Sequence, residues 1–226
     1  MARAGARAGR PAGAAGTRRA LVLAAVDALR EAGFSGASAR EIARRAGCSQ
    51  ALVFYHFGSV TELLLAALDE VSAVRYARYH AAVQAAGSVP ELVAAARAVF
   101  EEDLDNGHAA VLAEMISGAQ VTPGLGAEIA ARIRPWQDFA VEAISETLNA
   151  TPAAGLLPAQ PMAHALVALY LGLEMLSSLE GDRAAAREVF DQADVLAALL
   201  DLFGRTSSAA PEQQEETWPP VPASAR

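Results

Sequence analysis

Residues 38–64, which read SAREIARRAGCSQALVFYHFGSVTELL, constrain the fold of this chain more than any other segment. Ser38 is followed three positions later by Glu41, and this capping-box spacing marks the start of a helix. Ser59 and Glu62 repeat the spacing further along. The segment is therefore predicted to hold two short helices followed by the start of a third.

A tight turn is predicted between the first two of these helices. Gly47 accepts a left-handed backbone there, and Ala43 is small enough for a second helix to cross closely. Ser49 can cap that second helix, while Val53 and Phe57 can dock it onto the first. Such a pair is a helix-turn-helix, whose second helix enters the major groove of DNA. An ordinary helical hairpin in an all-α enzyme or scaffold is the alternative.

The charge is divided unevenly along the chain. The whole chain carries a formal net charge of −8. Residues 1–60 hold nine arginines against three acids, a net charge of +6, whereas the remainder carries −14. A basic end on an acidic body is typical of a DNA-binding head joined to a domain that does not contact DNA.

The rest of the sequence predicts an all-α fold. It is 53% hydrophobic but only 6% aromatic and rich in alanine, which favours helices. Gly33 should end the first helix, with Phe34 filling the head's small core, and Pro135 should bend a long later helix. The predicted helices are 17–32, the two of the helix-turn-helix, 59–80, 91–103, 108–117, 122–148, 162–180 and 182–203. The predicted domains are a disordered basic arm (1–16), a helix-turn-helix domain (17–58), a larger helical domain (59–204) and a disordered tail (205–226).

The sequence indicates no catalytic or metal-binding pattern. Cys48 is the single cysteine, which excludes an internal disulfide and favours a buried structural thiol. The four histidines are scattered, and no Ser-His-Asp arrangement is indicated. The acids near 101–105 are interpreted as solvated charge at a helix end. We expect no enzyme activity, metal or cofactor. The absence of a charge-free apolar run and of a secretory signal predicts a cytoplasmic protein that does not enter membranes.

The EAGF of residues 31–34, the SAREIARRAGCSQALVFYHF of 38–57 and the GSVTELL that follows resemble the N-terminal domain of the TetR family of transcriptional regulators. The resemblance covers about residues 17–68. It implies a three-helix head on a body that binds a small-molecule effector and dimerises. It further implies a repressor that binds a palindromic operator as a homodimer and is released by its effector. A helical adaptor or scaffold without DNA binding is the alternative function.

The resemblance also assigns DNA-contacting positions. Gln50 opens the recognition helix, and its amide can form two hydrogen bonds with an adenine edge. Phe54 stands where the family usually has a tyrosine and Val60 where it usually has a lysine, so two phosphate contacts are lost. The predicted DNA-binding residues are Arg18, Arg19, Ser38, Arg40, Ser49, Gln50, Ala51, Leu52, Phe54, Tyr55, His56 and Ser59.

The effector site and the dimer interface are predicted in the body. Aromatic, apolar and isolated polar side chains there are candidates to line a cavity, although most such residues are ordinarily core. The predicted effector-site residues are Phe100, His108, Leu112, Met115, Trp136, Phe139, Tyr170 and Glu174. The last two helices carry apolar residues at three- and four-residue steps, as in a four-helix bundle between subunits, unless they face their own core. The predicted interface residues are Leu166, Leu169, Tyr170, Leu173, Leu196, Leu199, Leu200 and Phe203.

Overall fold

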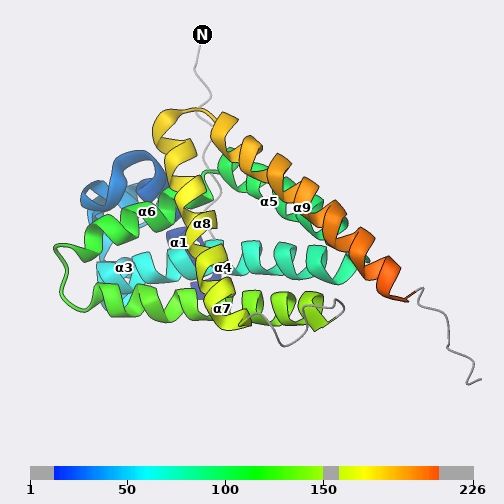
Figure 1. Cartoon of the computed structure of the whole chain (residues 1–226). Helices are drawn as coiled ribbons and strands as arrows, with labels where there is room; N and C mark the ends of the chain where they lie inside the picture. The colour runs from blue at the N-terminus through cyan, green and yellow to red at the C-terminus, as the bar shows by residue number, and fades with distance from the viewer. Residues whose placement is uncertain (1–12, 150–157, 209–226) are drawn as a thin grey trace, which may run out of the picture.

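The computed structural model describes residues 13–149 and 158–208, with side chains described through Leu202. Within these ranges the regular structure consists of nine α-helices, which confirms the all-α prediction (Figure 1). The helices are α1 (Ala14–Gly36), α2 (Ala39–Arg45), α3 (Gln50–Phe57), α4 (Val60–Ala85), α5 (Val89–Asp105), α6 (His108–Ala119), α7 (Leu125–Asn149), α8 (Ala159–Glu180) and α9 (Ala184–Ser208).

Several helix boundaries differ from the predicted ones. The first helix begins at Ala14, inside the segment predicted as a disordered arm, because Ala14 and Ala15 favour helix and the Thr17 N–H bonds to the Gly13 carbonyl. Gly204 lies inside α9 rather than after it. The rest of the predicted arm (1–12) and tail (209–226) lies outside the described residues.

The helix-turn-helix forms as predicted. The Ser38 hydroxyl accepts the Glu41 N–H at 3.3 Å, and the Ser59 hydroxyl accepts the Glu62 N–H at 3.1 Å. Gly47 has φ +66°, the left-handed conformation expected of this turn. One detail of the prediction is wrong: Ser49 occupies the N-cap position of α3, but its side chain makes no capping hydrogen bond.

The head and the body share one hydrophobic core. Ile42, Ala43 and Val53 of the helix-turn-helix are buried in the same cluster as Leu63 and Leu64 of α4. The cluster continues without a break into α6 and α7 through Val111, Met115, Leu125 and Ile129. The head is therefore held against the body by ordinary core packing.

The joint between head and body lies where α1 meets α6. Gly33 has φ +71° and ψ 179°, so it interrupts the helix as predicted. Phe34 packs against the hydrophobic core that the head shares with the body, and it also reaches α6. It packs on Gly118 of α6, and its backbone N–H donates to the Glu114 carboxylate at 2.8 Å. Phe34 takes this place because Gly118 leaves room for its ring.

The body helices pack in pairs. In Figure 1, α8 crosses α7 and α9 lies along α5, while α8 and α9 diverge from their connection. Pro135 lies inside α7, which continues through it. α8 is long and apolar enough to cross a membrane by length and composition, as is the bent pair of α3 and α4; this is weak evidence, because core helices of soluble proteins pass the same test.

A buried ion-pair cluster joins four body helices. The Arg75 Nε of α4 donates to Asp103 of α5 at 2.7 Å, and its Nη2 donates to Glu174 of α8 at 2.6 Å. His108 of α6 lies 3.2 Å from the other Asp103 oxygen. Asp103 is completely buried. The prediction that it belongs to a group of solvated acids is therefore wrong, because Arg75 gives it a partner inside the body.

Burial and neighbouring charges shift the ionisation of this cluster. Burial, together with the nearby Asp103 carboxylate, raises the pKa of Glu174 to about 7 against the opposing effect of Arg75. Burial on its own would lower the pKa of Arg75, but the two carboxylates outweigh it and the pKa is raised. Arg75 therefore stays charged, while Glu174 titrates near neutrality.

We predict that Gly118→Ala destabilises the protein by about 1–3 kcal/mol, because the added Cβ would fall 2.3–2.5 Å from the Phe34 ring. Urea unfolding measures the effect. Gly126→Ala is the matched control, because the nearest atom to its Cβ is 3.9 Å away and alanine favours helix. Equal stability of the two variants would contradict the packing of Phe34 on Gly118.

We also predict that Glu174→Gln changes how stability depends on pH. Because the folded-state pKa of Glu174 lies above its ordinary 4.5, the folded state binds more protons between pH 4.5 and about 7. The contribution of this group to the free energy of unfolding therefore falls as pH rises through that window. Relative to the variant, the wild type should lose about 1–3 kcal/mol between about pH 5 and about pH 8.

Urea unfolding at the two pH values measures this difference. Glu180→Gln, at an exposed carboxylate of the same helix, should keep the wild-type pH dependence. The raised pKa of Glu174 is contradicted if the free energies of unfolding of the wild type and Glu174→Gln differ by the same amount at both pH values.

Candidate functional site

The exposed face of α3 is the candidate DNA-reading surface. Gln50, Ala51, Phe54 and Tyr55 recur at one- and four-residue steps, so they share one side of the helix and all are exposed. Val53 is buried on the opposite side and anchors α3 to the head. Tyr55 is 78% exposed and Phe54 47% exposed, an unusual exposure for aromatic side chains in a small head.

Three other predicted residues lie around this face. Leu52 is half-buried against the head's core, so packing already accounts for it. The His56 ring lies between the rings of Tyr55 and Phe57, with centroids 5.0 and 6.4 Å away. The Arg18 guanidinium of α1 lies 4.8 Å from the Phe57 ring centroid, which places this cation beside the C-terminal end of α3.

Ion pairs neutralise part of the head's positive charge. Arg44 and Arg45 both bind Glu41, at 2.6 and 2.7 Å, and Arg45 also binds Glu31 at 2.7 Å. Hydrogen bonds from Arg44 and then Arg45 lower the pKa of Glu41 to about 2, so the carboxylate stays ionised.

The other predicted cations of the head remain exposed. Within the described part of the chain no ion pair involves Arg18, Arg19 or Arg40. These three arginines are therefore available to bind phosphates.

The predicted serines begin helices near the same surface. The Ser38 and Ser59 hydroxyls are occupied as caps, so these residues can offer a phosphate only the N-terminal ends of α2 and α4. The exposed Ser49 makes no capping bond and keeps its hydroxyl free for a contact. Burial raises the pKa of the half-buried Cys48 thiol, which fits the predicted structural role rather than a reactive one.

A second candidate site is a cavity of about 410 Å³ in the body. Five predicted effector-site residues line it: His108, Leu112, Trp136, Phe139 and Tyr170. The structure does not bring the other three to the wall. Phe100 and Met115 are fully buried core residues, the former packed on Tyr170 and Phe190, and Glu174 lies behind Arg75.

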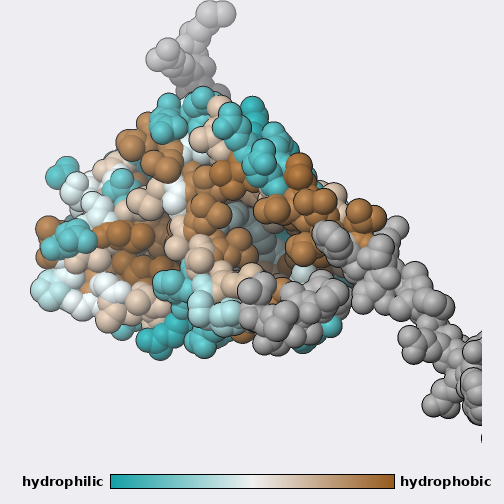
Figure 2. Space-filling view, in the orientation of Figure 1, coloured by the Kyte–Doolittle hydropathy of each residue, from teal (hydrophilic) through white to brown (hydrophobic). Residues whose placement is uncertain are grey.

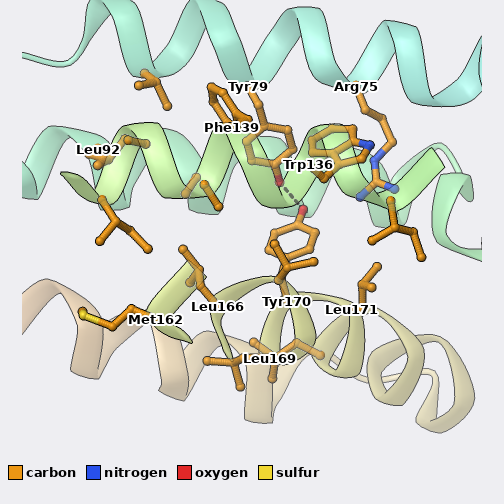
Figure 3. A pocket seen from close by; sticks show the side chains of 18 of the residues that line it. Arg75, Tyr79, Leu92, Trp136, Phe139, Met162, Leu166, Leu169, Tyr170 and Leu171 are labelled. Atoms are coloured by element: carbon orange, nitrogen blue, oxygen red, sulfur yellow. Dashed lines mark hydrogen bonds between the residues drawn. The ribbon is translucent and has the colours of Figure 1, made fainter. Parts of the chain in front are cut away.

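Sequence reasoning missed two residues that define the polar part of this cavity, Arg75 and Tyr79 of α4. Tyr79 and Tyr170 approach from α4 and α8, and the Tyr79 hydroxyl donates to the Tyr170 hydroxyl (Figure 3). The Tyr170 hydroxyl donates in turn to the buried carboxylate of Asp103 at 3.4 Å. Burial raises the pKa of both tyrosines, so they stay protonated.

A signal for Arg75 was present in the sequence. It follows Leu68 and Val71 at steps of three and four residues, on the apolar stripe of a predicted helix. An arginine on such a stripe is rarely buried unless it is paired. Finding its partners, however, required knowing that α5 and α8 pass beside it.

The predicted dimer residues with described side chains divide into three groups. Leu196 and Leu199 are exposed and lie outside the cavity wall, whereas Tyr170 and Leu173 are half-buried and line it. Leu166, Leu169 and Leu200 line the cavity and are also exposed. Figure 2 shows apolar residues gathered along α8 and α9 with a hollow between them. The side chain of Phe203 lies outside the described residues.

Comparisons with known proteins agree on the family. Residues 21–67 match the family model described as bacterial regulatory proteins, tetR family. No curated protein sequence matches the chain. The fold is similar to that of a TetR transcriptional regulator from Chloroflexus aurantiacus, with a TM-score of 0.68 at 17% identity over 80% of this chain and 94% of that one.

Two further solved structures share the fold. A TetR-family regulator from Cytophaga hutchinsonii has a TM-score of 0.67 at 18% identity, over 82% of this chain and 95% of that one. The regulator FadR of Bacillus subtilis, in complex with stearoyl-CoA, has a TM-score of 0.68 at 14% identity, over 79% and 96%. The helix-turn-helix, the family match over the head and the shared fold lead to one conclusion: residues 21–67 form a TetR-type N-terminal domain, and the chain has the fold of TetR-family regulators.

Proposed function

We propose that this protein is a cytoplasmic repressor that binds a palindromic operator as a homodimer and leaves it when a small molecule fills the body cavity. The observation that carries the proposal is the exposed face of α3, which presents Gln50 on a head whose Arg18, Arg19 and Arg40 are also exposed. An adaptor that binds only proteins would have no use for an amide and free cations on the helix that family members insert into DNA.

Base-specific contacts are assigned to Gln50 and Ala51, at the N-terminal end of α3. The glutamine amide suits an adenine edge and the alanine methyl suits a thymine methyl. Arg18, Arg19 and Arg40 supply phosphate contacts, together with Tyr55, the free Ser49 hydroxyl and the helix ends at Ser38 and Ser59. These contacts compensate for Phe54 and Val60, the two positions that lack the family's usual phosphate ligands.

The exposed apolar residues of α8 and α9 support dimerisation. Leu166, Leu169 and Leu176 on α8 and Leu196 and Leu199 on α9 are between 46% and 61% exposed. Contiguous exposed apolar surface of this kind marks an interface. A second copy is the occupant that the proposed operator symmetry requires.

The cavity supports regulation by an effector because two of its helices also hold the head. α4 begins in the shared core and lines the cavity from Leu68 to Val83. α6 lines it through His108 and Leu112 and binds the head through Glu114. The FadR structure with stearoyl-CoA supports the idea that this fold accommodates an elongated ligand. Effector and operator should weaken each other's binding by the same factor.

We predict that Gln50→Ala weakens operator binding by about 1–3 kcal/mol and relaxes the preference at one base pair in each half-site. Arg18→Ala should instead weaken binding to all duplexes and reduce the salt slope by about one phosphate contact per subunit. Binding to genomic promoter fragments, measured by anisotropy at two salt concentrations, separates the two effects. Arg187→Ala on α9 is the charge-matched control and should leave both unchanged. If the wild-type protein binds no genomic fragment more tightly than a random duplex, the proposal of sequence-specific DNA binding is wrong.

We predict that Leu176→Arg combined with Leu196→Arg converts the proposed dimer into monomers, because charges cannot be buried unpaired in an apolar interface. These monomers should remain helical but bind a full operator at least about tenfold more weakly. Sedimentation at micromolar concentration and circular dichroism measure these outcomes. Val121→Arg, at an apolar residue that is 78% exposed in the turn before α7, is the control and should stay dimeric. A monomeric wild type would contradict the interface.

A further inference from the structure

The charged residues around the cavity are already paired. Besides Arg75, held by Asp103 and Glu174, the cavity wall contains Arg132, which binds Asp69 at 2.7 Å and Glu128 at 2.9 Å. Each arginine of the wall thus has two carboxylate partners. Within the described residues, no charged side chain on the cavity wall lacks an ionic partner of opposite sign.

A charged ligand would therefore find no counter-ion. An anion would have to displace a carboxylate from Arg75 or Arg132, and a cation would have to reach carboxylates that lie behind or beside these arginines. Either ion would also lose its hydration against a wall made mostly of leucine, isoleucine, valine and aromatic side chains. The wall favours a ligand without net charge.

The cavity is long as well as apolar. Its wall follows α4 from Leu68 to Val83 and α7 from Arg132 to Leu148. At 1.5 Å per helical residue, these segments extend about 22 and about 24 Å. A ligand that fills the space is elongated rather than compact.

The tyrosine pair sets the chemistry of the ligand's polar group. Asp103 Oδ2 accepts hydrogen bonds from the Arg75 guanidinium and from the Tyr170 hydroxyl. Tyr170 must therefore donate to Asp103, which leaves the Tyr170 oxygen as an acceptor and makes Tyr79 the donor to it. This chain of hydrogen bonds has one direction, from Tyr79 through Tyr170 to Asp103.

A group inserted between the two tyrosines must preserve that direction. It has to accept a hydrogen bond from Tyr79 and donate one to Tyr170. A hydroxyl does both, whereas an ether or ester oxygen only accepts and would leave the Tyr170 oxygen without a donor, at the cost of a buried unsatisfied group. Figure 3 shows the two hydroxyls meeting across the cavity, with Arg75 and Trp136 on one side and Leu92, Leu166 and Met162 on the other.

We propose that the effector of this cavity is an elongated, uncharged apolar alcohol whose hydroxyl inserts between Tyr79 and Tyr170. The inference deepens the proposed function and rests on the cavity being the effector site. Its apolar chain lies along α4 and α7, and the hydroxyl completes the chain from Tyr79 to Asp103.

The experiment uses the full-length protein and four probes with the same ten-carbon chain: 1-decanol, decyl methyl ether, decylamine and decanoate. Their dissociation constants are obtained by displacement of Nile red, an uncharged apolar dye. We expect 1-decanol to bind at least about tenfold more tightly than either ion. It should bind about fivefold more tightly than the ether, the value of one net hydrogen bond. Decanoate, decylamine or the ether binding as tightly as 1-decanol would overturn the proposal.

Variants test the role of the tyrosines. Tyr79→Phe and Tyr170→Phe each break the chain of hydroxyls, so the preference for 1-decanol over the ether should disappear while Nile red still binds. Two variants are needed because either ring also packs on aromatic neighbours. Tyr76→Phe is the matched control, because Tyr76 lies on the same helix but its hydroxyl takes no part in the chain, and it should keep the wild-type preference. A preference that persists in both Tyr79→Phe and Tyr170→Phe would refute the assignment.

Operator affinity is then measured in the presence of the same probes. This measurement separates failure of the proposed effector response from failure of the proposed cavity chemistry. If 1-decanol binds in the expected order but leaves operator affinity unchanged, the proposed effector response fails and the cavity chemistry stands. If Nile red does not bind, or no probe displaces it, the cavity is not the effector site and this inference falls with it.

Discussion

The body of this protein is arranged around one buried charge, the guanidinium of Arg75. Removing such a group from water costs several kcal/mol, and the cost is met only by close partners. Asp103 and Glu174 provide them from two other helices, and His108 lies against Asp103 from a third. Replacing a buried ion pair with apolar residues is often neutral or stabilising. The cluster therefore orients the helices around it more than it stabilises the fold. Its geometry fixes where α4, α5, α6 and α8 stand around the cavity.

The same cluster explains why the cavity can be apolar and yet contain two arginines. Each arginine is held by two carboxylates, so the wall presents neutralised charge rather than an ionic site. The pair of tyrosines is a polar feature of this wall, and the direction of its hydrogen bonds is set by Asp103. The buried charge therefore determines, through Tyr170, which ligand groups can be accepted without leaving a partner unsatisfied.

Much of the head could be predicted from the sequence because its determinants are local. The caps at Ser38 and Ser59 and the left-handed Gly47 each involve residues within a few positions of one another. The contact of Phe34 with Gly118 was not predicted because Gly118 is distant in sequence, and a glycine gives no periodic signal. Asp103 was misinterpreted for a similar reason. A carboxylate in a run of acidic residues indicates solvent exposure, and its ion-pair partner Arg75 is distant in sequence.

The cavity was only partly predictable. Aromatic residues such as Trp136 and Tyr170 were recognised as candidates by type, but type alone could not separate them from Phe100 and Met115, which are core. The dimer prediction met the same limit. The three- and four-residue steps on α8 identified an apolar stripe, but the divergence of α8 from α9 decides which of its residues face the cavity and which face outward.

The route from the cavity to the head follows from these contacts. A ligand hydroxyl between Tyr79 and Tyr170 must widen the approach of α4 to α8, because it adds an atom to a direct contact. The displacement acts on α4 about 30 Å from its start at Ser59, given 1.5 Å per residue, and a helix transmits it as a rigid lever. α6 provides a second attachment through Glu114 and Phe34. In the proposed dimer, α8 and α9 would be held at the interface, so movement would be directed to α4 and α6, the two helices that hold the head. Occupancy of the cavity would then change the spacing of the two recognition helices.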